Sequence, residues 1–176
     1  RELADQTLGI IGIGRLGRKV ANYGNAFGMN IIGYDKNPKR IPDYISIVSS
    51  VKDLVMNSDV ISIHIHATPE NYNLLSKEIL SYLKPDTCLI NTSRGEIVDE
   101  FELVKLLKIK KIAGYAADVV ANELAENKTP LQEYAMSSPT NLILTPHIGG
   151  FTVESRLKAE IFMAEKFVDH KLKFIN

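Results

Sequence analysis

The chain has 176 residues, of which 45% are hydrophobic, and its 21 basic and 21 acidic residues give a formal net charge of zero. This length and composition suit one globular domain with a sizeable core, and the balanced charge argues against non-specific binding of nucleic acid. No apolar stretch approaches the roughly 20 residues that span a bilayer, and the N-terminus lacks a signal-peptide pattern. We therefore expect a cytosolic protein without membrane or nucleic-acid partners.

The first predicted element pair surrounds a glycine-rich turn. The apolar run 8–11 predicts a strand, Gly12-x-Gly14-x-x-Gly17 follows at once, and the residues after it have the periodicity of a helix. Gly12 permits a sharp turn, Gly14 lets the backbone approach a pyrophosphate, and Gly17 lets the helix pack closely on the sheet. The free N–H groups at the helix N-terminus favour phosphate binding, so the sequence predicts a dinucleotide site.

A second predicted strand, 30–34, ends at Asp35. An acid at this position accepts hydrogen bonds from the adenosine ribose and repels a 2′-phosphate, so the sequence favours NAD over NADP. Lys36, Lys39 and Arg40 follow closely enough to hold a phosphate. NADP therefore stays open as an alternative cofactor.

The remaining chain alternates between strand and helix signals, which predicts an α/β fold: a Rossmann-type, doubly wound parallel sheet with helices on both faces. Strands are expected at 45–48, 59–65, 89–92, 113–118 and 142–145, and helices at 50–56, from 76 to a stop at Pro85, at 99–108 and at 153–170. The polar segment 122–139 contains two prolines and is interpreted as a functional loop with one helical turn.

The cysteine and the histidines predict neither a disulfide framework nor a metal site. The single cysteine, Cys88, lies in an apolar run and is expected to be a buried strand residue, and one cysteine cannot form a disulfide framework. The four histidines lack the spacing of metal ligands, so no metal site is predicted.

Polar residues stand at the carboxyl ends of the predicted strands, where parallel α/β sheets bind their ligands. Besides the glycine turn and Asp35, they are His64 to Thr68, Thr92-Ser93-Arg94, Asp118 and His147-Ile148-Gly149-Gly150. Each group alone is explained by the residue preferences of turns. Because all of them follow strands, we expect them to converge on one edge of the sheet.

The chemistry for reducing a ketone with a nicotinamide cofactor is offered by two of these polar residues and by Glu123, which lies in the loop after Asp118. His147 is the candidate general acid/base, because imidazole titrates near neutral pH. Glu123 is the candidate carboxylate that raises the histidine pKa and orients the ring, and Arg94 can clamp an α-carboxylate through its planar fork. A helix-capping histidine, a surface glutamate and an arginine in a solvated turn are the alternatives that the residues alone leave open.

Three segments together resemble one enzyme family. GIIGIGRLG at 9–17, LKPDTCLINTSRGEIVDE at 83–100 and TPHIGG at 145–150 resemble the D-isomer-specific 2-hydroxyacid dehydrogenases, the family of D-3-phosphoglycerate dehydrogenase. The resemblance is to the cofactor-binding domain and covers almost the whole chain. It implies NAD as cofactor, a homodimer built through the cofactor domains, and hydride transfer between nicotinamide C4 and C2 of a D-2-hydroxyacid or 2-keto acid.

The resemblance also implies roles for individual residues. It assigns catalysis to Arg94, Glu123 and His147, with the histidine giving a proton to the substrate carbonyl or taking one from the hydroxyl. It implies cofactor contacts along the whole predicted sheet edge, at Gly12, Gly14, Arg15, Leu16, Gly17, Asp35, His64, Thr68, Thr92, Ser93, Arg94, Asp118, His147, Gly149 and Gly150.

The sequence departs from the family pattern at two places. Leu124 follows Glu123 where the family usually has proline, which affects the geometry of the loop that carries the glutamate. His66 stands where proline is common, and we interpret it as a surface histidine.

Family members carry a second, substrate-binding domain, which takes roughly 100 residues or more. We therefore interpret residues 1–176 as the NAD-binding domain alone, inactive or very slow without a substrate-binding domain. Two alternatives stay open: a non-catalytic NAD(H)-binding regulatory module, and an NADPH-dependent reductase that uses the basic residues after Asp35.

Overall fold

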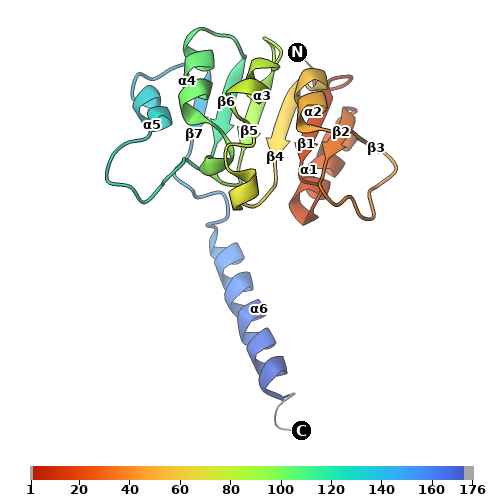
Figure 1. The fold of residues 1–176 in the computed structure, drawn as a ribbon. Coiled ribbons are helices and arrows are strands. Elements are labelled where there is room, and N and C mark those ends of the chain that lie inside the picture. Colours follow the sequence, from red (N-terminus) through yellow and green to blue (C-terminus); the bar gives the residue numbers. More distant parts are fainter. Residues whose placement is uncertain (1, 173–176) are drawn as a thin grey trace. The chain divides into compact units, whose positions relative to one another are not determined.

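The computed structural model describes residues 2–172, and the chain divides into two compact units, Arg1–Leu144 and Thr145–Asn176 (Figure 1). The strands of the first unit are β1 (Thr7–Ile11), β2 (Asn30–Tyr34), β3 (Ile45–Ile47), β4 (Val60–Ile63), β5 (Cys88–Asn91), β6 (Gly114–Ala117) and β7 (Leu142–Leu144). Its helices are α1 (Arg15–Ala26), α2 (Val51–Asn57), α3 (Lys77–Ser81), α4 (Glu100–Lys108) and α5 (Pro130–Ala135), with short 3₁₀ turns η1 (Pro69–Asn71) and η2 (Gly95–Ile97). The second unit contains α6 (Val153–Leu172).

The strands form one parallel sheet in the order β3-β2-β1-β4-β5-β6-β7. The chain runs outward from β1 through β2 to β3 and then returns to the other side of β1 through β4. This reversal makes the carboxyl ends of β1 and β4 the topological switch point, the place where such sheets bind ligands. The predicted doubly wound α/β fold is confirmed.

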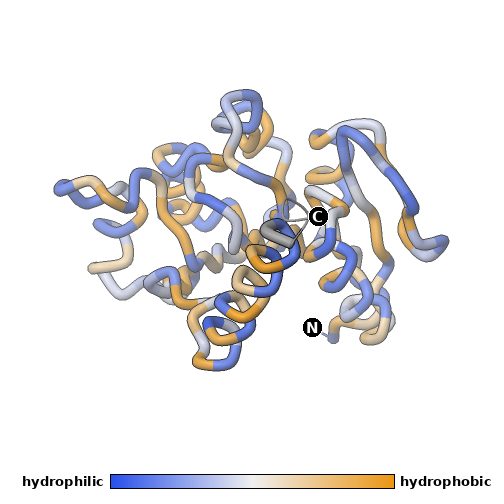
Figure 2. Tube along the Cα trace, turned by 90° about the horizontal axis from the view of Figure 1, so that it is seen from below, coloured by the Kyte–Doolittle hydropathy of each residue, from blue (hydrophilic) through white to orange (hydrophobic). Residues whose placement is uncertain are grey.

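Alternation along β1 divides the hydrophobic core between the two faces of the sheet. Leu8 and Ile10 pack in one cluster with Ala21 of α1, whereas Ile11 packs in a larger cluster with Leu54 of α2. In Figure 2 the hydrophobic stretches of the first unit lie mainly in its interior and the hydrophilic ones at its periphery. Helices therefore cover both faces, as predicted.

Glycines set how closely α1 approaches the sheet. A Cβ at Gly17 would overlap the carbonyl oxygen of Gly12, and one at Gly24 would press on Leu8. Gly12 has φ of +92°, which other residues rarely adopt. The interpretation of Gly12 as a turn residue and of Gly17 as a packing residue is therefore supported by the backbone geometry.

Local capping signals explain where several helices begin. Ser50, Ser76, Asp99 and Thr129 are N-caps of α2, α3, α4 and α5, and each side chain accepts a hydrogen bond from a backbone N–H three residues later. Thr129 and Gln132 form a capping box, which accounts for the helical turn in the segment predicted to be a loop.

The expectation that Cys88 is buried is wrong. The residue begins β5, as its apolar neighbours indicated, but its side chain is exposed. Leu89, the next residue, is fully buried in the larger core cluster on the opposite face of the strand. An apolar run with no alternation predicts a strand covered on both sides, and here one side of the strand end remains open within the first unit.

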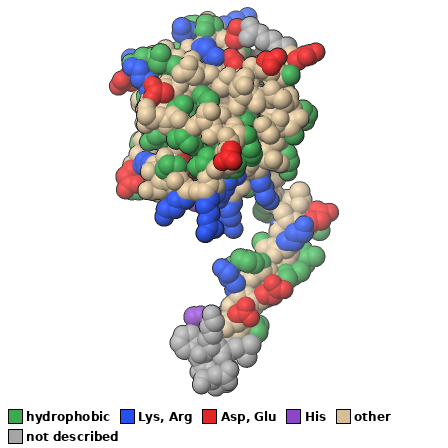
Figure 3. Space-filling model, turned by 90° about the vertical axis from the view of Figure 1, so that its right-hand side faces the viewer, with side chains coloured by type: hydrophobic (Ala, Val, Ile, Leu, Met, Phe, Trp, Pro, Cys, Tyr) green, Lys and Arg blue, Asp and Glu red, His purple; other side chains and the backbone are tan. Residues whose placement is uncertain are grey.

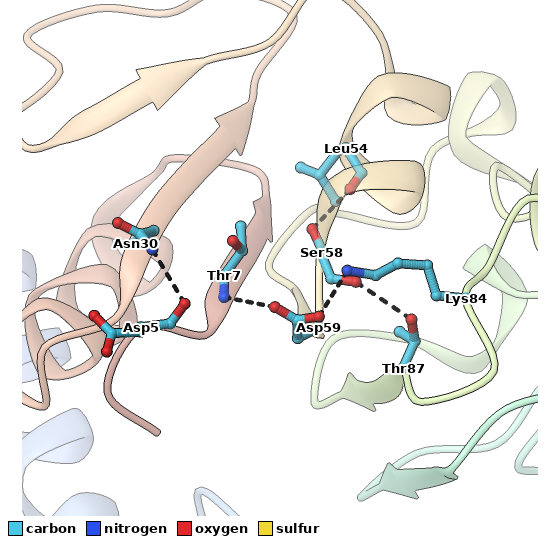
Figure 4. A network of polar contacts seen from close by, with 8 residues as sticks. All are labelled: Asp5, Thr7, Asn30, Leu54, Ser58, Asp59, Lys84 and Thr87. Atoms are coloured by element: carbon cyan, nitrogen blue, oxygen red, sulfur yellow. Dashed lines mark hydrogen bonds and ion pairs between the residues drawn. The ribbon is translucent and has the colours of Figure 1, made fainter. Parts of the chain in front are cut away.

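A polar network ties three strands together at their amino ends (Figure 4). Asp59, which precedes β4, accepts a hydrogen bond of 2.8 Å from the backbone N–H of Thr7 in β1 and one of 2.6 Å from the Lys84 ammonium. Thr87, which precedes β5, donates to the carbonyl of Ser58 at 3.3 Å. This edge of the sheet is closed by internal bonds, so the polar residues at the opposite edge are the candidates for a ligand site.

Candidate active site

The glycine turn after β1 is anchored to the end of β2. Gly12 donates its N–H to the carbonyl of Tyr34 at 2.8 Å, and Ile13 donates to a carboxylate oxygen of Asp35 at 2.8 Å. The other oxygen of Asp35 accepts from the N–H of Asn37, also at 2.8 Å. Asp35 thus lies beside the predicted dinucleotide turn, and its carboxylate fixes the turn as well as offering its remaining lone pairs to a ligand.

The N-terminus of α1 has the features of a phosphate cradle. Its N-cap is Gly14, which provides no side-chain cap to the first turn, and a Cβ at this position would meet no atom within 4 Å. Arg15 and Leu16, the next two residues, are exposed. Open space over uncapped N–H groups fits a pyrophosphate, so the residues present suit a dinucleotide cofactor.

Basic residues lie on the side of this turn that carries Asp35. Lys39 and Arg40 are exposed, and Arg18 of α1 donates to both of their carbonyl groups at 3.4 Å. The Lys36 ammonium donates to the side chain of Asn71 at 3.1 Å. Figure 3 shows Lys and Arg side chains gathered at the end of the first unit toward which β4 points in Figure 1. Positive charge therefore accompanies Asp35 at this end of the sheet.

The end of β4 presents a half-buried histidine whose pKa is lowered by burial. The ring nitrogen Nε2 of His64 lies 2.8 Å from the Ser62 hydroxyl, and the backbone N–H of His64 donates to Ile11 at 2.7 Å. Burial lowers the pKa of His64 below its ordinary value of 6.5. Thr68 is half-buried at the start of η1, and His66 is exposed, as expected for a surface histidine.

A buried asparagine that the sequence reasoning did not single out organises the turn after β5. Asn91 accepts from the N–H of Ser93 at 3.0 Å and donates to the carbonyl of Arg94 at 2.9 Å. The Ser93 hydroxyl donates to Ile63 in β4 at 2.7 Å, while Thr92 stays exposed. An asparagine that ends a buried strand before Thr-Ser was the available signal.

The structure brings two of the three predicted catalytic residues together. Arg94 and Glu123 line one hollow of about 480 Å³, together with Glu96, Val120, Asn122, Leu124 and Ala125. Glu123 accepts a hydrogen bond of 3.3 Å from the N–H of Val120, and Leu124 is fully exposed. Asp118 is buried at the end of β6 and donates its N–H to Asn91 at 3.1 Å.

Two further carboxylates hold the loop that carries Glu123, and sequence reasoning missed both. Glu100 accepts from the N–H of Ala121 at 2.6 Å, and Glu96 accepts from that of Asn122 at 3.2 Å. Glutamates in the first turn of a helix normally serve the helix dipole, so nothing in their spacing indicated a contact with a distant loop.

The other predicted site residues belong to the second unit. His147 is exposed with φ of +52°, and its N–H donates to the carbonyl of Thr145 at 3.0 Å. Gly149 is exposed, and a Cβ at Gly150 would meet no atom within 4 Å. Their part in cofactor binding or catalysis stays a prediction.

Within 2–172, no group of three or more His, Cys, Asp or Glu side chains is placed to hold a metal ion. None of the helices in the same range has the length and apolar character that a bilayer crossing requires.

A parallel sheet with a switch point, a glycine turn at that point and an acid at the end of the next strand define a dinucleotide-binding Rossmann domain. The model of the D-isomer specific 2-hydroxyacid dehydrogenase family, NAD binding domain, matches residues 1–149. The chain therefore belongs to this family, as the resemblance predicted, and provides its NAD-binding domain.

Curated relatives differ in the reactions they are named for. A glyoxylate reductase of Aeropyrum pernix is 38% identical over 95% of this chain and 49% of its own length. A D-3-phosphoglycerate dehydrogenase of Synechocystis is 36% identical over 96% of this chain and 30% of its own length. The chain therefore spans half or less of these relatives.

Similar solved structures confirm the fold, and they include one complex with NAD and one with NADPH. A D-lactate dehydrogenase of Aquifex aeolicus, complexed with NAD and lactic acid, has a TM-score of 0.85 at 32% identity, covering 98% of this chain and 56% of that one. An acyclic imino acid reductase in complex with NADPH and D-Arg has a TM-score of 0.86 at 34% identity, covering 98% and 53%.

Proposed function

We propose that the protein containing this chain is an oxidoreductase that transfers a hydride between NAD(H) and a D-2-hydroxyacid or the corresponding 2-keto acid. The observation that carries the proposal is the hollow shared by Arg94 and Glu123 on the unit that bears the dinucleotide turn. A guanidinium and a carboxylate beside a nicotinamide site provide the means to hold a 2-keto acid and to tune a proton donor.

The cofactor contacts follow from the strand ends. The N–H groups at the start of α1 would bind the pyrophosphate, with Arg15 and Leu16 beside it, and Asp35 would accept hydrogen bonds from the adenosine ribose. The nicotinamide end is assigned to the later strands, with contacts at His64, Thr68, Thr92, Ser93, Asp118, Gly149 and Gly150. NADH, when bound, supplies the hydride.

Each proposed catalytic residue has a separate task. Arg94 binds the substrate carboxylate through its planar fork and polarises the neighbouring C2 carbonyl. His147 gives a proton to the carbonyl oxygen during reduction and takes it back during oxidation, and Glu123 favours the imidazolium and orients the ring. The reaction then needs no metal ion, because a cation and a proton donor already meet the developing alkoxide.

A single variant tests this assignment in the protein as naturally expressed. Arg94→Gln should lower kcat/KM for 2-keto acids by roughly 100-fold, because a charged bidentate contact is lost, and leave NADH affinity almost unchanged. Lys105→Gln removes one positive charge from the exposed surface of α4 and is the matched control. Glyoxylate, pyruvate and phosphohydroxypyruvate form the substrate panel, and NADH oxidation is the readout.

Absence of turnover by the unaltered protein with every acid of the panel, while NADH still binds, would contradict the enzyme proposal. The regulatory NAD(H)-binding module would then be the better description.

The basic residues beside Asp35 support NADPH as a second candidate cofactor. Asp35→Ala should weaken NADH binding by about tenfold and improve NADPH binding, because a charged acceptor for the ribose hydroxyls is lost and the 2′-phosphate is no longer repelled. Parallel fluorescence titrations with both cofactors measure this, and Asp43→Ala, an exposed acid of the same connection, is the control. NADPH binding by the unaltered protein tighter than NADH binding would contradict the preference for NAD.

We further propose that residues 1–176 are the cofactor-binding half of a longer, cytosolic, homodimeric enzyme that carries a substrate-binding domain. The shares of 30% and 49% of two relatives support the greater length. Intact mass, light scattering and cell fractionation of the naturally expressed protein test length, dimer and location in turn.

A further inference from the structure

The loop between β6 and α5 is held through three successive backbone N–H groups. Glu123 accepts from Val120 at 3.3 Å, Glu100 from Ala121 at 2.6 Å, and Glu96 from Asn122 at 3.2 Å. Two of these three carboxylates come from the segment that directly follows Arg94. The contacts therefore connect the arginine turn to the loop that carries Glu123.

The same two segments also meet backbone to backbone. A Cβ at Gly95, the residue after Arg94, would overlap the peptide between Val120 and Ala121. Glycine at this position lets η2 approach the loop closely enough for Glu96 and Glu100 to reach its N–H groups. The two sides of the hollow thus form one connected piece of structure.

The side chains of the loop that follow these contacts are exposed. Asn122 has φ of +51°, and the residues from Asn122 to Lys128 are exposed. No side chain in this stretch is buried, so the backbone bonds at residues 120–122 help to set the position of the loop, together with the turn in which Ala125 donates its N–H to Asn122 at 2.8 Å. Those bonds include the two that Glu96 and Glu100 accept.

Burying the Glu100 carboxyl group costs the fold free energy. The residue is only 5% exposed, and its Oε2 has no hydrogen-bond partner among the described residues. Burial raises its pKa, while hydrogen bonding from the Ala121 N–H, the Thr129 hydroxyl and the Leu131 N–H works in the opposite direction. Burying a carboxyl group costs free energy relative to a neutral side chain, and the hydrogen bond that it accepts from the loop at Ala121 is one contact that offsets this cost.

We propose that Glu100 and Glu96 are positioning residues that set Glu123 relative to Arg94 through the backbone of residues 120–122. The inference rests on the proposed function, in which Glu123 and Arg94 act on the same reaction. In this role Glu100 touches no substrate, whereas Glu96 also lines the hollow beside Arg94. They act by fixing the loop from which Glu123 extends.

The first test uses the naturally expressed protein. Glu100→Ala should lower kcat for the best 2-keto acid by roughly tenfold or more, because small displacements of a catalytic group are costly, while NADH affinity changes less than about twofold. Glu100→Gln keeps an acceptor for the Ala121 N–H and should restore most of kcat. Glu102→Gln, on the same first turn of α4 but paired with Lys105 at 2.6 Å, should behave as the unaltered protein.

A double variant separates positioning from a general effect on the fold. Glu100→Ala combined with Glu123→Gln should have the kcat of Glu123→Gln alone, since the position of Glu123 no longer matters once its carboxylate is gone. Should Glu100→Ala not fold, Glu96→Ala replaces it in the same comparison, because Glu96 is only half-buried.

Each outcome decides the question. Two reductions in kcat that multiply in the double variant, or a Glu100→Ala variant that changes thermal stability but not kcat, would overturn the positioning role. An unchanged kcat in Glu123→Gln would instead overturn the proposed role of Glu123, and with it the basis of this inference.

Discussion

Gly14 and Gly17 stand three residues apart but have different surroundings. We therefore expect Gly14 to matter for ligand binding and Gly17 for folding. Gly14 faces open space, whereas a side chain at Gly17 would collide with the carbonyl of Gly12. Gly14→Ala should therefore leave the free energy of unfolding within about 0.5 kcal/mol of its original value. It should weaken NADH binding by roughly tenfold, because the methyl group occupies the path of the pyrophosphate.

Gly17→Ala should instead destabilise the fold by about 1–3 kcal/mol, because α1 must move away from the sheet. Chemical denaturation measures the free energy of unfolding and fluorescence titration measures NADH affinity, with each variant serving as the control for the other. Equal losses of stability in the two variants would show that Gly14 is a packing residue as well.

His64 links stability to pH in a direction that its burial determines. Because its folded pKa is below the ordinary 6.5, the unfolded chain binds the proton more readily. The contribution of neutral His64 is fully present above the unfolded pKa and is lost as pH falls through and below it. Glu100, whose folded pKa is raised, has the opposite sign, since its contribution declines as pH rises from about 4.5.

The loss of stability between about pH 7 and pH 5 should therefore be smaller in His64→Gln, which keeps a polar group near Ser62. Thermal melts across that range, with His66→Gln at the exposed neighbouring histidine as control, provide the measurement. If the loss of stability were as large in His64→Gln as in the unaltered protein, the pH dependence would come from another group.

At the scale of elements, the sequence predicted what local patterns determine and missed what tertiary contacts determine. The strand 30–34 has its predicted bounds, and the helix expected at 50–56 lies within one residue of α2 at each end, because alternation and capping are properties of neighbouring residues. The exposure of Cys88 depends on which helices cover the sheet, which no local pattern contains. The same holds for Glu100, whose partner lies 21 residues away along the chain.

The contribution of one such local feature, the N-cap Ser50, to the free energy of unfolding can be measured. Its hydroxyl oxygen accepts from the N–H of Asp53 at 3.0 Å and thereby caps α2, whose Leu54 and Val55 are fully buried. Ser50→Ala should reduce the free energy of unfolding by about 1 kcal/mol. Ser46→Ala, at an exposed position of β3, is the control, and equal effects in the two variants would contradict the capping role.

At the scale of the whole molecule, strand order explains why an edge of the sheet could be predicted from sequence. Parallel strands all end at the same edge, so residues after β1, β2, β4, β5 and β6 converge whatever lies between them. This convergence brings Arg94 and Glu123 into one hollow from positions 29 residues apart. His147 follows β7 and enters the second unit, so its relation to that hollow is a matter for experiment.

Residues 1–176 alone should bind the cofactor but turn over little substrate. The dinucleotide turn, Asp35 and their hydrogen bonds all lie within the first unit, so NADH should bind and raise thermal stability, by about 2.7 kcal/mol at 100 times the dissociation constant. Turnover of a 2-keto acid should be at least roughly 100-fold slower than in the longer protein proposed above, because orienting the substrate and excluding water require a second wall over the hollow.

Thermal shift with NADH and the rate of NADH oxidation, measured side by side on the two proteins, separate binding from catalysis. Equal rates would mean that this chain holds its substrate without a further domain, and the hollow beside Arg94 would then be the complete substrate site.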